Sequence, residues 1–74
     1  TNESKLYLPH GQNLISLNHA SLDDLMKLKG IGEKTAIKID EYRQKTPFQT
    51  IEDLMNIQGI GEKTYLRLRE YLCL

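Results

Sequence analysis

The hexapeptide Gly-Ile-Gly-Glu-Lys-Thr occurs twice in this chain, once as Gly30–Thr35 and again as Gly59–Thr64. Two glycines around one apolar residue let the backbone turn sharply and approach a partner closely, because glycine has no Cβ that could clash. The Glu-Lys-Thr that follows is typical of a first helical turn, where backbone N–H groups lack intrahelical acceptors and the helix dipole is positive. Each copy is therefore predicted to be a tight turn that presents donors to an anion such as a phosphate.

The residues before each hexapeptide predict a short helix. Asp24 follows Ser21 by three residues and Asp53 follows Thr50 by three, which is a shortened form of the capping box. Apolar residues then recur at helical spacing. We predict one helix from about Ser21 to Leu28 and a second over the equivalent stretch from Thr50, each ended by the first glycine of the hexapeptide.

A helix is also predicted after each hexapeptide. The first begins at Gly32 and ends at Lys45 or Thr46, because Pro47 disfavours helical geometry in the residue before it. An apolar stripe at helical spacing marks its inward face, and the last helix repeats that stripe. The residues expected to point inward are Ala36, Ile39 and Tyr42, and then Tyr65, Leu68 and Tyr71 or Leu72.

The segments 21–42 and 50–71 align without a gap, and half of their positions are identical. Such an internal repeat indicates a duplicated structural unit. Two short helices cannot bury their apolar faces alone, so the two halves must pack on each other. The predicted fold is all-α, a pair of helix-turn-helix units with four to five short helices, pseudo-twofold symmetry and both hexapeptides on one side.

The length and composition of the chain describe one small, neutral domain. A chain of 74 residues buries only about 60% of the surface that its unfolded form exposes, which leaves little room for an enzyme cleft. Lys and Arg together number 10, as do Asp and Glu, so nucleic-acid binding has to depend on where the charges lie. We expect a leader over 1–14, a domain over 15–74 that opens with an extended arm at Ile15 and Leu17, and a fragment of a longer protein, since Thr1 is not Met.

Around the hexapeptides the chain resembles the tandem helix-hairpin-helix domain, and most specifically that of the ComEA-type competence DNA receptor family. The resemblance extends from about Ile15 to Leu72. It rests on the stretches Leu17–Ser21, Asp24–Leu25, Leu28–Ala36, Tyr42–Arg43, Pro47–Phe48, Ile51–Leu54 and Gly59–Thr64.

This resemblance implies binding of double-stranded DNA without sequence specificity, with hairpin amides on phosphates across the minor groove. It also implies that a monovalent cation can sit on hairpin carbonyls, and an extracytoplasmic location. Lys29 stands where many family members have proline, which adds charge near the expected phosphate face. The candidate DNA-binding residues are Gly30, Ile31, Gly32, Lys34, Thr35, Lys38, Gly59, Ile60, Gly61, Lys63, Thr64 and Arg67.

The candidate residues differ in what their type allows. Lys34 and Lys38 have cationic equivalents in Lys63 and Arg67, whereas Lys27 and Lys29 become Asn56 and Gln58 in the second half. Glu33 and Glu62 are interpreted as solvated charges that complement the helix dipole. Thr35 and Thr64 can donate to a phosphate or to a local carbonyl, and both alternatives stay open. For Ile31, Ile60, Tyr42 and Tyr71 the sequence favours core packing over contact with a sugar or a base.

No catalytic or metal-binding pattern is evident in the sequence. His10 and His19 have no Cys or carboxylate cluster at ligand spacing, Cys73 is the sole cysteine, and the paired acids are typical of caps. We therefore expect a DNA-binding protein without enzymatic activity and without a required cofactor. The alternatives are a structural or protein-interaction module and the DNA-positioning domain of a larger repair or transcription enzyme.

Overall fold

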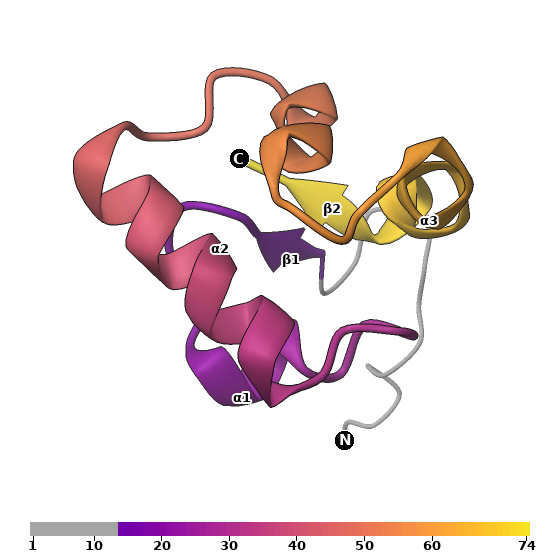
Figure 1. Ribbon diagram of the computed structural model, residues 1–74, viewed down its shortest axis with the longest axis horizontal. Helices are drawn as coiled ribbons and strands as arrows, with labels where there is room; N and C mark the ends of the chain where they lie inside the picture. The colour runs from indigo at the N-terminus through magenta and orange to yellow at the C-terminus, as the bar shows by residue number, and fades with distance from the viewer. Residues whose placement is uncertain (1–13) are drawn as a thin grey trace.

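The computed structural model describes residues 14–74, which form a mostly helical domain with one short two-stranded sheet (Figure 1). The predicted leader over 1–14 lies, apart from Leu14, outside the described residues. In chain order the elements are β1 (Ile15–Ser16), α1 (Leu22–Leu25), α2 (Glu33–Lys45), the 3-10 helix η2 (Ile51–Asn56), α3 (Glu62–Leu68), the 3-10 helix η3 (Arg69–Tyr71) and β2 (Leu72–Cys73). The predicted all-α class and the helical hairpins are confirmed.

The two helices that precede the hairpins are shorter or tighter than predicted. α1 ends at Leu25 rather than Leu28, and the Leu28 N–H donates to the carbonyl of Leu25, three residues back. The equivalent second segment, η2, is a 3-10 helix throughout. Bonds to the third residue back are common in short helical pieces, and here they lead directly into the glycine turns.

The predicted caps are present, but only the second is complete. The Ser21 side chain accepts from the Asp24 N–H, while the Asp24 carboxylate lies 3.1 Å from the Lys27 ammonium. In the second half, Thr50 accepts from the Asp53 N–H and the Asp53 carboxylate accepts in return from the Thr50 N–H, 3.2 Å away. The N–H groups of Gln49 first and Thr50 next hold the pKa of the Asp53 carboxyl below its ordinary value of 3.8.

The chain ends close the domain through a parallel strand pair. Ile15 pairs with Leu72 and Ser16 with Cys73, so the predicted extended arm is confirmed as β1. Its partner β2 was not predicted. α3 ends at Leu68 and continues as η3, and the chain then enters β2 with Leu72 buried and Tyr71 exposed. Of the two predicted alternatives, Leu72 is the inward residue, and the predicted core packing of Tyr71 is wrong.

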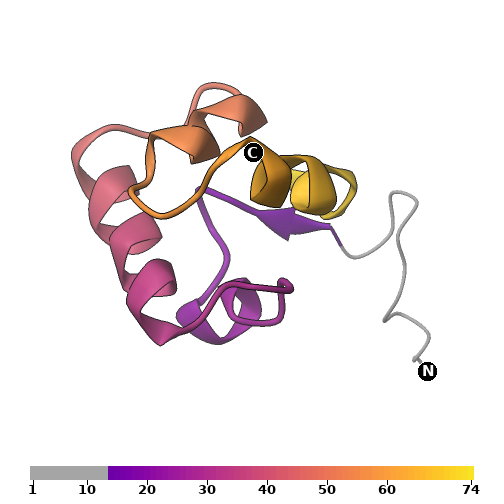
Figure 2. The same cartoon turned by 45° about the vertical axis from the view of Figure 1, so that its right-hand side comes forward.

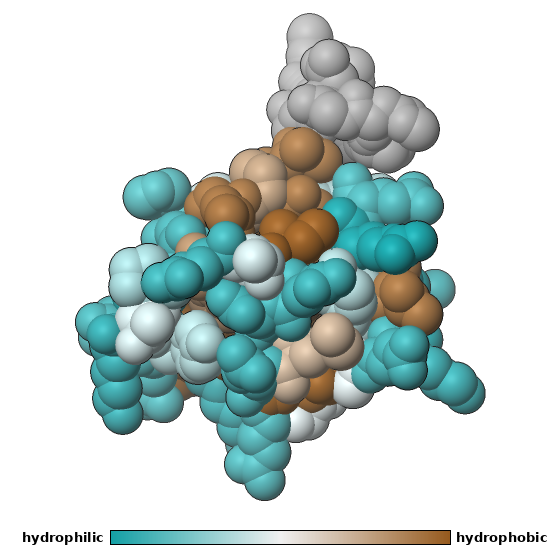
Figure 3. Space-filling view, turned by 90° about the horizontal axis from the view of Figure 1, so that it is seen from above, coloured by the Kyte–Doolittle hydropathy of each residue, from teal (hydrophilic) through white to brown (hydrophobic). Residues whose placement is uncertain are grey.

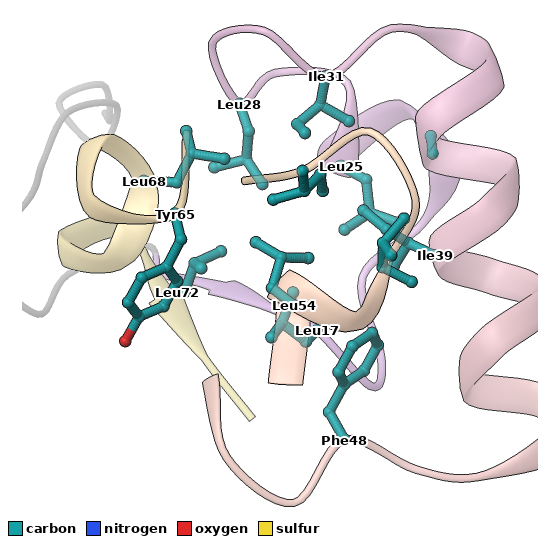
Figure 4. Close-up of a cluster of buried hydrophobic side chains, with 13 residues drawn as sticks. Leu17, Leu25, Leu28, Ile31, Ile39, Phe48, Leu54, Tyr65, Leu68 and Leu72 are labelled. Carbon is teal, nitrogen blue, oxygen red and sulfur yellow. The ribbon is translucent and has the colours of Figure 1, made fainter. Parts of the chain in front are cut away.

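The core is apolar and lies between the two halves (Figure 4). Among the described residues, no buried residue is charged or polar. The buried positions of the two halves repeat at the spacing of the hexapeptides, as a duplicated unit requires. The equivalent pairs are Leu25 and Leu54, Leu28 and Ile57, Ile31 and Ile60, Ala36 and Tyr65, and Ile39 and Leu68.

Two polar side chains join residues 17–20, here called the entry loop, to the rest of the domain. The Arg43 guanidinium donates to the carbonyls of Leu17 and Ala20, at 2.9 and 2.7 Å, and is oriented by Asp40. Asn18 exchanges two hydrogen bonds with the backbone of Phe48. The loop therefore fixes the position of α2 relative to the strand pair.

Some apolar side chains stay on the surface, and Figure 3 shows one face where such brown patches alternate with hydrophilic side chains. Several of them are again equivalent in the two halves, as Met26 with Met55 and Ile37 with Leu66. None of the described helices is long and apolar enough to cross a membrane.

Candidate nucleic-acid interface

The first glycine of each hexapeptide makes the hairpin turn. Gly30 and Gly59 have φ values of 90° and 98°, in the left-handed region that side chains other than glycine rarely adopt. The next N–H in each turn donates back to the end of the preceding helix, from Ile31 to the Leu28 carbonyl and from Ile60 to the Ile57 carbonyl, both at 3.0 Å. The two hairpins thus have the same backbone geometry, and the fold itself requires glycine at this position.

The second glycine of each hexapeptide has no such requirement. Gly32 has φ −91° and ψ −171°, and Gly61 has φ −101° and ψ −172°, which are ordinary extended values. A Cβ added at either position would meet nothing within 4 Å. Since neither backbone strain nor crowding within the domain calls for glycine here, its presence keeps the outer side of the hairpin open.

These second glycines are also helix N-caps without a side chain to satisfy the helix start. The helical hydrogen bonds begin with Ala36 N–H to the Gly32 carbonyl at 2.9 Å and Tyr65 N–H to the Gly61 carbonyl at 3.0 Å. The amides before them have no acceptor in the helix, and no side chain of residues 14–74 caps either end. Ser21 and Thr50, by contrast, cap the preceding helices. The helix starts at the hairpins therefore lack the side-chain caps that the preceding helices have.

The isoleucines between the glycines are core residues. Ile31 and Ile60 are only 4% and 5% exposed, so the preferred interpretation of inward packing is confirmed. Their side chains anchor each hairpin to the core, so any contact of these two residues with a partner would be made by their backbone. Thr35 and Thr64 are half-buried, and both alternatives for their hydroxyls, a phosphate or a local carbonyl, stay open.

The candidate cations are all exposed. Lys34 and Lys63 lie in the first turns of α2 and α3, and among the described residues neither is in an ion pair. Glu33 and Glu62 beside them are exposed, as predicted. Lys29, which has no cationic equivalent in the second half, is exposed directly before Gly30.

Lys38 and Arg67 lie farther along the same two helices. The Lys38 ammonium donates to the Gln58 carbonyl at 3.5 Å, next to the second hairpin. A guanidinium nitrogen of Arg67 lies 3.7 Å from the point where Gly30 would carry a Cβ, in the first hairpin. Both cations therefore lie close to hairpin backbone.

Metal binding finds no support in the part of the chain that the structure covers. No three His, Cys, Asp or Glu residues gather there in a way that could hold a metal ion. His10 lies outside the described residues. The possible monovalent cation on hairpin carbonyls stays a prediction.

Residues 10–73 match the helix-hairpin-helix motif family, and the chain belongs to that family. Motifs of this kind generally bind nucleic acid. The chain is also similar to the kinesin-like protein KIN-10C of Arabidopsis thaliana, with 49% identity over 41 residues. That match covers 55% of this chain and 6% of the kinesin-like protein, so the chain spans a small part of this relative's length.

Sequence reasoning missed two residues that join the segment 17–20 to α2 and to Phe48. Arg43 and Asn18 were quoted only as part of the family resemblance, with no role of their own. Their partners are main-chain carbonyls and amides 23 to 30 residues away, and spacing along one helix does not reveal such contacts. The available signal was an arginine at a position where the repeat places an apolar residue, Leu72, in the second half.

Proposed function

We propose that this domain binds double-stranded DNA without sequence specificity, through the backbone of its two hairpins. The observation that supports this most strongly is the conformation of Gly32 and Gly61. Each is glycine without a need within the fold, next to helix-start amides that no side chain caps. A surface this bare allows a phosphodiester to approach the backbone, and helix-start amides favour an anion.

The expected indifference to sequence follows from the kind of group involved. Amide N–H groups that bind phosphate oxygens position a protein on DNA but read no base edges. The candidate surface offers amides, hydroxyls and flexible cations. Two equivalent hairpins on one rigid core suit two phosphate strands that are themselves related by local twofold symmetry.

Charge has a secondary role in this proposal. The chain has no net charge, so the attraction must come from cations near the hairpins, namely Lys34, Lys38, Lys63 and Arg67. About four neutralised phosphates give a slope of log K against log salt of about −3 to −4. A slope near zero in titrations of duplex DNA would contradict the mechanism.

The more specific role that we propose is the DNA-receiving module of a DNA-uptake apparatus, with no catalytic activity of its own. It is supported by the resemblance of Ile15–Leu72 to competence receptors. The alternative is a DNA-binding module within a larger protein of another kind. The match to a short part of a kinesin-like protein favours that alternative, because it places a similar sequence inside a much longer chain.

The decisive experiment separates DNA binding from folding at the second glycines. In the double variant Gly32→Asn with Gly61→Asn, the new side chains fit the extended backbone and Asn is a preferred N-cap, so the thermal midpoint should not fall. Affinity for a mixed-sequence duplex should fall at least about tenfold, because the side chains cover the amides. A hydrogen bond to a charged group contributes about 1.5–3 kcal/mol, and a tenfold change in affinity corresponds to about 1.4 kcal/mol.

A matched pair of variants tests the role of charge. Gly32→Asp with Gly61→Asp has nearly the same shape and cap strength as the Asn variant but places a carboxylate at each hairpin. It should bind more weakly than the Asn variant. Duplex binding at the wild-type level by both folded variants would remove the hairpins from the proposed function.

A further inference from the structure

Lys38 and Arg67 are equivalent residues, and each lies beside the hairpin of the other half. Lys38 belongs to α2, yet its ammonium bonds the Gln58 carbonyl that precedes Gly59. Arg67 belongs to α3, yet its guanidinium lies 3.7 Å from the Cβ position of Gly30. One hydrogen bond and one close approach, at two separate places, thus show the same exchange between the halves.

The core explains why both cations cross over. Ile39 follows Lys38 and Leu68 follows Arg67, and both apolar side chains are buried, with 0% and 1% exposed. Since these neighbours face the interface between the halves, the adjoining cations lie at its rim and extend toward the opposite half. Figure 2 shows the loop between η2 and α3 alongside α2, where Lys38 bonds it.

We propose that each hairpin forms a composite phosphate-binding site, with backbone from one half and a cation from the other. Arg67 completes the first hairpin and Lys38 completes the second. The inference rests on the proposed function, since it assigns cations to the same two hairpins. Its ligand is the phosphodiester group of a DNA strand.

The chemistry of the two cations fits this assignment. The lysine ammonium has three donors, so the bond to Gln58 leaves two for a phosphate oxygen. Arginine presents a planar fork that matches phosphate geometry. Among residues 14–74 the Arg67 guanidinium forms no ion pair.

A composite site makes the two halves dependent on each other. Changing a cation on α2 should weaken the second hairpin, and changing one on α3 should weaken the first. Each of these two cations also lies on the helix that follows the hairpin of its own half, which provides the comparison within one motif. The pattern of energetic coupling therefore distinguishes crossed sites from two separate motifs.

The test is a set of double-mutant cycles on duplex-DNA affinity in the full chain. The single variants are Lys38→Gln, Arg67→Gln, Gly32→Asn and Gly61→Asn. We expect Lys38→Gln with Gly61→Asn, and Arg67→Gln with Gly32→Asn, to weaken binding at least about threefold less than the product of their single effects. Within one motif, the single effects on affinity should multiply. These pairs are Lys38→Gln with Gly32→Asn and Arg67→Gln with Gly61→Asn.

Salt dependence separates direct phosphate contact from a structural effect of the Lys38–Gln58 bond. Removing a cation that neutralises a phosphate lowers the magnitude of the salt slope by about 0.9, and Lys38→Arg should restore it. Three outcomes would overturn the composite sites. They are energetic coupling within each motif, single effects on affinity that multiply in all four pairs, and a salt slope of duplex binding that is unchanged in both Lys38→Gln and Arg67→Gln. Wild-type binding with no salt slope would instead overturn the proposed function itself.

Discussion

The two halves share their hairpins and differ in what surrounds them. In the first half Lys27 pairs with Asp24 and leaves the cap incomplete, whereas Asn56 in the second half leaves Asp53 to the backbone and the capping box closes. The first half also has Lys29, which the second replaces with Gln58. The backbone turn is the invariant part of the duplication, while caps and charges were free to diverge.

The ends of the halves differ even more. α2 continues for 13 residues and uses Arg43 to hold two carbonyls of the entry loop. α3 has only 7 residues, and Leu72, the equivalent of Arg43, enters the core as part of β2. The same repeat position therefore binds loop carbonyls as Arg43 in one half and packs in the apolar core as Leu72 in the other.

The largest expected effect tests whether the halves form one cooperative unit. Leu25 and Leu54 are equivalent and fully buried. Leu25→Ala and Leu54→Ala should each lower the free energy of unfolding by about 2–5 kcal/mol, because both leave a cavity in the shared core. Urea unfolding should show a single transition for both variants. Met55→Ala, at an exposed position, is the control, and two separate transitions would mean that the halves fold independently.

The second-largest expected effect is on stability and concerns Arg43, whose equivalent in the second half is Leu72. Arg43→Met should lower the free energy of unfolding by about 2 kcal/mol, because the carbonyls of Leu17 and Ala20 lose charged donors in a mostly buried setting. Arg43→Lys keeps the charge but cannot reach both carbonyls with a planar fork, and should recover only part of the loss. Chemical denaturation measures the free energy of unfolding of both variants. Wild-type stability of Arg43→Met would mean that these two hydrogen bonds do not stabilise the fold.

Much of this fold could be predicted from the sequence because its information is local and repeated. The glycine turns, the Ser21 and Thr50 caps, the end of α2 at Lys45 and most of the apolar stripe follow from spacing of a few residues. The hairpin isoleucines were correctly assigned to the core for the same reason.

The parts that sequence reasoning missed are long-range or depend on small changes of helical turn. The pairing of β1 with β2 joins residues 57 positions apart, and two-residue strands leave no alternating pattern. The 3-10 form of η2 and η3 differs from an α-helix by one hydrogen-bond step, and the exposed position of Tyr71 was not predicted. Lys38 and Arg67 each lie beside the hairpin of the other half because of how the halves pack, and the repeat alone does not specify that packing.

The smallest expected effect concerns the cap that only the second half completes. Because the folded-state pKa of Asp53 is lowered from 3.8, its ionised form stabilises the fold above that pH. As pH falls below 3.8 toward the folded-state pKa, the unfolded chain takes up the proton first and this stabilisation is lost. Asp53→Asn should therefore flatten the acid side of a stability curve measured by thermal unfolding between about pH 2 and 5. Asp24→Asn is the matched variant in the first half, where the carboxylate contacts Lys27 instead of completing the cap. It should leave the Asp53 contribution in place, and equal flattening by both variants would mean that the two caps respond to acid alike despite their different contacts.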